Sequence, residues 1–131
     1  MSQENVEIVL ASYEWANRER RFARRWWHDG GEYINAREDP DHAVHRGAEE
    51  IEKLFASWLE AYPDVTVNPL EARANGQRVF VWVRFVGTAA GSGITLTMEL
   101  AHVITLEQGK IRRLEECFDR VAGLNAVGLE E

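Results

Sequence analysis

The stretch that decides the fold is residues 94–119, which read ITLTMELAHVITLEQGKIRRLEECFD. In positions 94–106 apolar residues alternate with threonine and other residues, and this two-residue period is typical of a β-strand. Gln108-Gly109 supplies the positive-φ residue of a tight turn, and Ile111 begins a return strand. We therefore predict an antiparallel hairpin at this place in the chain.

A histidine interrupts the apolar face of the first strand of this hairpin. The residues that share the face are Leu96, Met98, Leu100, His102, Ile104 and Leu106. Histidine is the side chain whose ordinary pKa lies nearest to neutral pH, which suits it to proton transfer. His102 is therefore a candidate catalytic residue, and the competing interpretation is a core histidine bonded to a neighbour.

The return strand offers an inward carboxylate at one of two positions. Ile111 and Leu114 break the two-residue period, which predicts a β-bulge at 112–113. Beyond the bulge, Glu116 has the same parity as Leu114. We predict that Glu116 faces inward and is catalytic together with the histidine. A shift of the register by one residue would put Glu115 there instead.

Length and composition indicate one ordinary globular domain spanning residues 1–131. The chain is 45% hydrophobic, has a formal net charge of −7 and contains one cysteine, Cys117. The negative charge disfavours nucleic acid and anionic membranes as partners. No apolar run is long enough to span a membrane, and no signal peptide is evident, so we expect a cytoplasmic location. A single cysteine excludes an internal disulfide and a multi-thiol metal site.

The remaining patterns predict an α+β fold in which a curved antiparallel sheet wraps over three N-terminal helices and encloses a pocket. The three helices are expected near Val6–Asn17, around Phe22–Trp27 and over Ala48–Ala61. His28–Gly31 is expected to end the second helix, and Glu32–Asn35 to form a short strand at an edge of the sheet. The long strands are expected at about 65–73, 78–86, 94–106 and 111–119, followed by a C-terminal tail that forms a short helix or a lid.

Aromatic residues on these elements are candidate walls of the pocket. Trp15 lies on the first helix, Phe55 and Trp58 share the apolar face of the third helix, and Phe85 lies on a central strand. Packing in the core explains these residues equally well. Sheets of this kind bind small apolar ligands between the concave face and the helices, so we expect a small apolar molecule as the partner.

The polar loop 36–46 contains Asp39, Asp41, His42 and His45, whose side chains are suited to metal binding. No other part of the sequence completes a metal motif, so we expect a solvated loop, no metal site and no cofactor.

The outer face of the sheet also carries apolar residues, notably Phe80 and Trp82. These residues need cover, and a second copy of the chain would provide it. We therefore expect a homodimer formed through this face.

With this order of elements in place, the chain resembles the nuclear transport factor 2-like superfamily, and more closely its SnoaL-like, ketosteroid-isomerase-like branch. The resemblance extends from about Glu4 to Asp119. It rests on Val6–Asn17, Glu32–Asn35, Arg46-Gly47, Ala101–Val103, Gly109–Ile111 and Glu115–Asp119. It implies the cone-shaped fold of that superfamily and a tendency to form dimers, but the scaffold hosts many activities.

Two activities of the superfamily match this chain only in part. Asn35 stands where steroid isomerases have their aspartate base, and an amide cannot accept a proton at neutral pH, so that reaction is not expected. Tyr33, Asn35 and Glu116 resemble the residues that hold the attacking water in limonene-type epoxide hydrolases. The Arg and Asp that protonate the epoxide in those enzymes are replaced by Val83 and Phe85.

The third resemblance, to SnoaL-like polyketide cyclases, leads to our functional hypothesis. These enzymes close a ring by an aldol reaction without a cofactor, using a carboxylate on the last strand and a histidine on its neighbour, and Glu116 and His102 resemble that pair. We expect acid–base chemistry on an apolar, carbonyl-bearing molecule, with Tyr33 and Asn35 orienting a water or a substrate oxygen. The alternative is a non-catalytic module for ligand binding or dimerisation.

Overall fold

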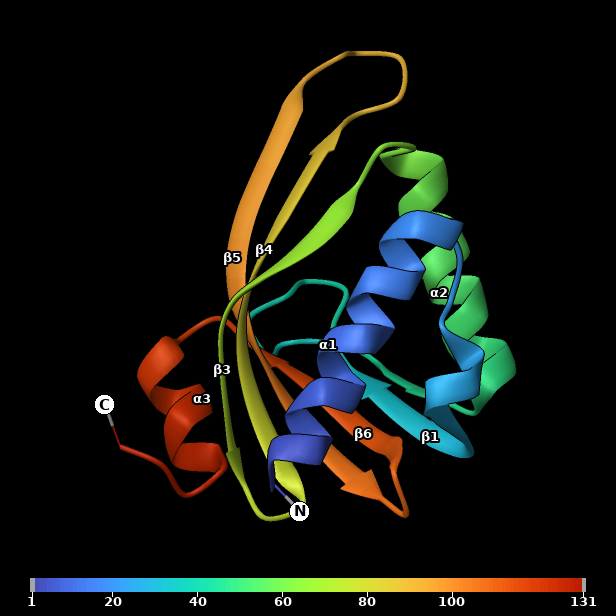
Figure 1. Ribbon diagram of the computed structural model, residues 1–131. Helices are drawn as coiled ribbons and strands as arrows, with labels where there is room; N and C mark the ends of the chain where they lie inside the picture. The colour runs from blue at the N-terminus through green and yellow to red at the C-terminus, as the bar shows by residue number, and fades with distance from the viewer. Residues whose placement is uncertain (1, 131) are drawn as a thin grey trace.

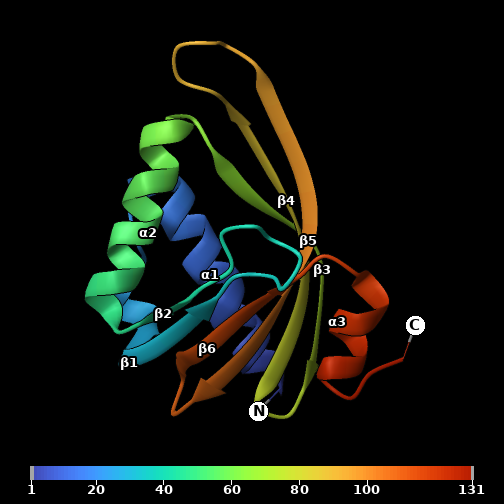
Figure 2. The ribbon, with the colours of Figure 1, turned by 180° about the vertical axis from the view of Figure 1, so that it is seen from behind.

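A computed structural model describes residues 2–130 of the chain. The elements in chain order are α1 (Ser2–Glu19), the 3₁₀ turn η1 (Arg24–Trp26), β1 (Trp27–Ile34), β2 (Val44–Arg46), α2 (Ala48–Ala61), β3 (Thr66–Asn75), β4 (Arg78–Thr88), β5 (Thr95–Glu107), β6 (Lys110–Cys117) and α3 (Arg120–Ala126). The strands form one curved sheet in the order β2-β1-β6-β5-β4-β3. Helices α1 and α2 lie on one face of this sheet and α3 lies on the opposite face (Figures 1 and 2). The α+β class is confirmed.

The predicted hairpin is confirmed, with its bulge. β4, β5 and β6 pair antiparallel, and His102 lies directly opposite Glu116. The pairing passes from Thr105↔Arg113 to Leu106↔Ile111, so Arg112 is the extra residue of the bulge. The extra residue lets Ile111 and Leu114, which are three positions apart, face the same side of the sheet. Glu116, two residues after Leu114, shares that side, so both His102 and Glu116 lie on the inner face.

The second predicted helix is wrong. The segment forms a single 3₁₀ turn, and the residues expected to break a helix lie within β1. Trp27 is 4% exposed and pairs with Ile111 of β6, so it is held as a strand residue. Gly31 has no side chain, and a Cβ there would lie 2.9 Å from the ring of Trp27. The strand pairing and this close approach outweigh the helical spacing of the aromatic residues.

The prediction of a fully antiparallel sheet with the strand of Tyr33 at its edge is also wrong. β1 pairs parallel with β6, where Tyr33 lies opposite Leu114. The end of the loop 36–46 folds back as β2, which pairs antiparallel with β1 and forms the edge, with His45 opposite Tyr33. Periodicity predicts that a segment is a strand, but it carries no information about the direction of its partner.

The core lies between the inner face of the sheet and the two long helices. Val79, Val81 and Val83 of β4 are fully buried there, as are Val9 of α1 and Ile51 of α2. Full burial of a side chain of this size contributes roughly 1.5–3 kcal/mol relative to exposure. The alternation along β4 therefore selects which of its faces meets the helices.

The C-terminal tail forms helix α3, which covers the outer face of the sheet. Leu124 and Val127 pack against Phe80, Ala101 and Val103, and all five are buried. The cover for Phe80, which motivated the predicted homodimer, is thus supplied by the same chain.

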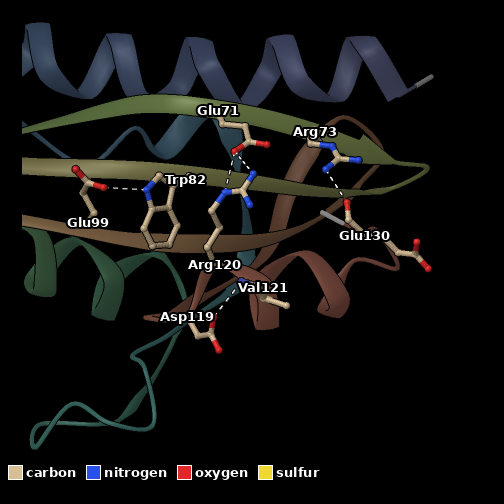
Figure 3. Close-up of polar contacts among 8 residues, drawn as sticks. All are labelled: Glu71, Arg73, Trp82, Glu99, Asp119, Arg120, Val121 and Glu130. Atoms are coloured by element: carbon tan, nitrogen blue, oxygen red, sulfur yellow. Dashed lines mark hydrogen bonds and ion pairs between the residues drawn. The ribbon is translucent and has the colours of Figure 1, made fainter.

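Polar contacts surround this second, smaller core (Figure 3). The Asp119 side chain caps α3 by accepting a hydrogen bond from the backbone N–H of Val121 at 3.0 Å. Arg120 forms an ion pair of 2.6 Å with Glu71 of β3. Within residues 2–130, no helix is both long and apolar enough to cross a membrane.

Candidate functional site

A cavity of about 80 Å³ lies between α1, α2 and the inner face of the sheet. Its walls are mostly apolar, and the aromatic residues among them are Tyr13, Trp27, Tyr33, Phe55, Trp58 and Phe85. His102 and Tyr33 bring polar atoms to it from β5 and β1. A concave apolar space with a few convergent polar groups is the usual form of a small-molecule site.

His102 is buried, with 2% of its surface exposed, and its two ring nitrogens differ. Nδ1 lies 2.7 Å from the hydroxyl oxygen of Tyr13 on α1. Nε2 has no hydrogen-bond partner, and within residues 2–130 it is the one buried side-chain nitrogen or oxygen of which this is true. A buried donor or acceptor left unpaired costs roughly 1–3 kcal/mol, which is a usual sign of a group reserved for a ligand.

The protonation of this pair follows from burial. Burial lowers the pKa of His102 to about 3, so the imidazole is neutral at physiological pH. Burial also raises the pKa of Tyr13 well above its ordinary value, so the phenol keeps its proton. If the phenol donates to Nδ1, the proton of the neutral ring sits on Nε2, and the other tautomer reverses the direction of this hydrogen bond. In the first of these tautomers, His102 presents an unpaired N–H donor.

Glu116 is partly buried and held by three donors. The hydroxyl of Tyr33 donates to Oε2 at 2.6 Å, while Oε1 accepts from the backbone N–H of Ala36 at 3.3 Å and from Nδ2 of Asn35 at 3.5 Å. Burial raises the pKa of Glu116, and the three hydrogen bonds oppose that rise only in part. Burial and the neighbouring carboxylate together raise the pKa of Tyr33. Tyr33 therefore keeps its proton and donates it to the carboxylate in a hydrogen bond.

The loop after β1 completes the support of this carboxylate. Nε2 of His45 lies 2.8 Å from Oδ1 of Asn35, which accepts its proton, and Nδ1 of His42 lies 2.8 Å from the Asn35 carbonyl oxygen. Both histidines were expected in a solvated loop, so this role was not predicted. His45 lies between Val44 and Arg46, which are exposed in the structure, and an apolar Val44 gave no sign in the sequence that His45 faces inward.

The structure brings most of the predicted site residues together, but it separates them into two groups. His102, Tyr33, Phe55, Trp58 and Phe85 line the cavity. Glu116 and Asn35 are not part of its lining. The carboxylate is linked to the cavity through Tyr33, which both lines the space and donates to Glu116.

Trp15, expected as a wall of the pocket, lies elsewhere. Its ring packs against Trp26 at a centroid distance of 5.6 Å and lines a separate surface hollow. Successive helix residues are turned by about 100°, so Trp15 points about 200° away from Tyr13, which faces the cavity. The aromatic composition of α1 does not distinguish these two positions, whereas the packing of the helix on the sheet does.

Comparison with known proteins places this geometry in a family. The model of the SnoaL-like domain family matches residues 9–114. A search of curated proteins found no match.

Solved structures show the same fold. One is a putative SnoaL-like polyketide cyclase from Jannaschia sp. CCS1, with 21% identity over 99% of this chain and 95% of that chain and a TM-score of 0.75. TerC co-crystallised with polyporic acid has 25% identity over 95% and 97% of the two chains and a TM-score of 0.75. An NTF2-like protein of unknown function from Burkholderia pseudomallei K96243 has 21% identity over 98% and 99%, with a TM-score of 0.72.

Proposed function

The chain belongs to the SnoaL-like domain family, and we propose that it binds a small, mostly apolar, carbonyl-bearing molecule in the cavity and performs cofactor-independent acid–base chemistry on it. The observation that carries this proposal is the unpaired Nε2 of His102 at an apolar cavity, which we take to carry the ring proton. Two of the similar structures support the proposal, because one is described as a putative polyketide cyclase and the other, TerC, was co-crystallised with the small molecule polyporic acid.

In the proposed reaction, His102 binds the carbonyl oxygen of the substrate. The ring is neutral because burial lowers the pKa of its protonated form to about 3, and a neutral imidazole is so weak an acid that it donates a hydrogen bond without giving up its N–H proton. The donor is fixed in place by Tyr13 and surrounded by apolar groups, so it would stabilise the negative charge that develops on the oxygen. The Tyr13–His102 pair thereby takes the role of an oxyanion-stabilising donor.

The proton moves through Tyr33 to Glu116. As the C–H bond next to the carbonyl breaks, its proton passes to the hydroxyl oxygen of Tyr33, whose own proton passes to Oε2 of Glu116 over the 2.6 Å hydrogen bond. The electron pair of the broken bond becomes the enolate, whose oxygen accepts from Nε2 of His102. The raised pKa of Glu116 favours this uptake at a pH nearer to neutral. The enolate carbon then attacks a second carbonyl of the substrate, or takes a proton back along the same route.

A second candidate function, a non-catalytic ligand-binding module, is favoured by one observation: Glu116 is absent from the lining of the cavity. An epoxide hydrolase has less support. Tyr33 and Asn35 do hold Glu116 as a trio, but Val83 is a fully buried core residue and Phe85 is apolar, so no acid faces the cavity from these positions.

Exchange of a C–H hydrogen for solvent deuterium tests the proposed proton transfer. A panel of aryl ketones and diketones is incubated with the protein in D₂O, and mass spectrometry measures deuterium next to the carbonyl. We expect Glu116→Gln to lower the exchange rate about 10²- to 10⁴-fold, which is the usual contribution of a general base. Ligand binding and the melting temperature should be largely unchanged.

Glu115→Gln is the matched control, since Glu115 lies on the neighbouring position and pairs with Val103 on the opposite face. It should exchange at the wild-type rate. Ligand binding without exchange in the wild type would support the binding module instead.

A homodimer remains a proposal for the outer face. Trp82 is half-buried there, and Val121 of α3 is 39% exposed. Sedimentation equilibrium at micromolar concentration should show a dimer that Val121→Asp weakens. A monomer at all concentrations would exclude it.

A further inference from the structure

Asn35 lies at the start of the loop that joins β1 to β2, and it is 7% exposed. Both of its backbone groups are hydrogen-bonded within the loop: its N–H donates to the carbonyl oxygen of Ala43 at 3.1 Å, and its carbonyl oxygen accepts from Nδ1 of His42 at 2.8 Å. Its side-chain amide lies between Nε2 of His45 and Oε1 of Glu116. The amide therefore connects the edge strand β2 to the carboxylate of the candidate site.

The orientation of this amide decides which form of Glu116 it favours. A half-turn of an asparagine amide exchanges its oxygen and its nitrogen. In the orientation observed, Nδ2 faces Glu116 and donates to the carboxylate. In the reverse orientation, Oδ1 would face Glu116, repel an ionised carboxylate and accept a proton from a carboxylic acid. A hydrogen bond to the charged form of an acid favours that form, and one to the neutral form favours the neutral form.

His45 holds the amide in the observed orientation. Oδ1 of Asn35 can only accept, so Nε2 of His45, 2.8 Å away, must carry the proton of this hydrogen bond. The bond from Nδ2 of Asn35 to Glu116 is longer, at 3.5 Å, so the amide is held more firmly from the side of His45. His45 is itself placed by strand pairing, because it lies opposite Tyr33 in the register of β1 and β2.

The groups around Glu116 come from β1, from the loop after it and from β5: Tyr33, Asn35, Ala36, Asp39 and His102. Burial raises the pKa of Glu116, the hydrogen bonds from Tyr33, Ala36 and Asn35 oppose that rise, and the charge of Asp39 adds to it. The hydroxyl of Tyr33 can serve either form of the acid, and the backbone N–H of Ala36 can only donate. The amide of Asn35 is thus the group whose preference depends on how it is held.

We infer that His45 is a positioning residue for Glu116: by donating to Oδ1 of Asn35, it keeps the amide nitrogen toward the carboxylate and so favours the ionised Glu116 that can accept a proton. This inference rests on the proposed function for its catalytic meaning, since that function requires Glu116 to start as a base. The chain of hydrogen bonds from His45 through Asn35 to Glu116 exists without substrate and can be tested without it.

NMR titration of the side-chain carboxyl carbon of Glu116 tests the inference directly. The signal is assigned by its absence from Glu116→Gln and followed from pH 4 to pH 9 in the ligand-free protein. We expect His45→Leu to raise the titration midpoint by about half a pH unit or more, because a hydrogen bond to the charged form is no longer held in place. His45→Gln keeps an N–H donor near the position of Nε2 and should titrate as the wild type does. Both replacements are neutral, so the difference between them reports the hydrogen bond.

A double-mutant cycle shows whether the effect passes through Asn35. Asn35→Ala should raise the midpoint about as much as His45→Leu does, and adding His45→Leu to Asn35→Ala should raise it no further. His28→Leu is the matched control, since it removes another half-buried histidine whose Nε2 lies 2.8 Å from a backbone carbonyl oxygen, that of Glu107. It should leave the midpoint of Glu116 unchanged. His45→Ala replaces His45→Leu if thermal unfolding shows that the leucine variant does not fold.

The pH profile of the deuterium exchange described above supplies the catalytic test. Its acid limb should move to higher pH in His45→Leu and stay in place in His45→Gln. An unchanged midpoint of Glu116 in His45→Leu, an equal rise in His45→Gln, or a further rise in the double variant would overturn the inference and leave the proposed function standing. A midpoint raised in His45→Leu alone, with no exchange in any of the proteins, would support the positioning role and count against the proposed function.

Discussion

The two faces of the same sheet are built differently. On the outer face, the chain closes its own surface: α3 buries Phe80, and Nε1 of Trp82 donates to Glu99 at 3.0 Å. On the inner face, the packing of α1 and α2 on the sheet leaves a cavity, and Nε2 of His102 remains unpaired at its wall. The face with the incomplete packing and the unpaired donor is the one suited to a ligand, because a polar group is left without a partner only where something else supplies one.

The two faces also differ in how closely their atoms pack. On the outer face, a Cβ on Gly123 of α3 would lie 2.7 Å from the Cβ of Ala101, so the helix docks with no space to spare. On the inner face, five aromatic side chains beside Tyr13 surround a space that holds no protein atoms. Close packing therefore stabilises α3 on the sheet, whereas the helices on the inner face are less closely packed around the cavity.

The largest expected effect is the dependence of stability on pH. The folded-state pKa of His102, about 3, lies below the ordinary value of 6.5, so the unfolded chain binds a proton that the folded chain does not. Stability from this residue is complete above pH 6.5 and falls as the pH is lowered toward 3, by at most ~1.4 kcal/mol per pH unit. Glu116 acts in the opposite direction: its pKa is raised, so its contribution is present at low pH and lost as the pH rises.

Urea unfolding between pH 7 and pH 4 measures this slope. As the pH falls, the double variant Tyr13→Phe with His102→Phe should lose less stability than the wild type, because it lacks the proton uptake of His102 on unfolding while the contribution of Glu116 is common to both proteins. An identical slope in the two proteins would show that His102 is not buried in its neutral form.

The next largest effect should come from the outer face. Gly123→Val places side-chain atoms against Ala101 and Phe80, and overpacking of this kind costs about 1–3 kcal/mol. Ala126→Val, at an exposed position of the same helix, introduces the same side chain where it meets no close neighbour and is the control, since valine forms helices no worse than glycine. Thermal unfolding should show a lower melting temperature for the first variant only. Equal melting temperatures would mean that α3 is not docked as described.

The smallest change in stability is expected for the inner face. Tyr13→Phe with His102→Phe replaces both partners of a buried hydrogen bond and removes the unpaired Nε2, a change that can be nearly neutral, within about 1 kcal/mol. Tyr13→Phe alone leaves Nδ1 unpaired and should be less stable than the double variant. Both comparisons use urea unfolding at pH 7. A loss of several kcal/mol in the double variant would show that the pair serves structure rather than a ligand.

Local patterns in the sequence determined much of this protein. The alternation of 94–106 and the Gln108-Gly109 turn specify the hairpin, because side-chain period and turn chemistry are local properties of the chain. The broken period at Ile111 and Leu114 specifies the bulge. Together these favoured Glu116 over Glu115 as the inward carboxylate, and in the structure Glu116 lies opposite His102.

Tertiary structure alone decided how the distant parts combine. Trp27 became a strand residue, β1 paired parallel with β6, and His45 reached Asn35, because these choices depend on pairing between segments far apart in the sequence. The rotation of α1 on the sheet turned Tyr13 toward His102 and Trp15 away from it. Packing also placed Tyr33 between Glu116 and the cavity, since the shape of an internal space depends on all the side chains that surround it.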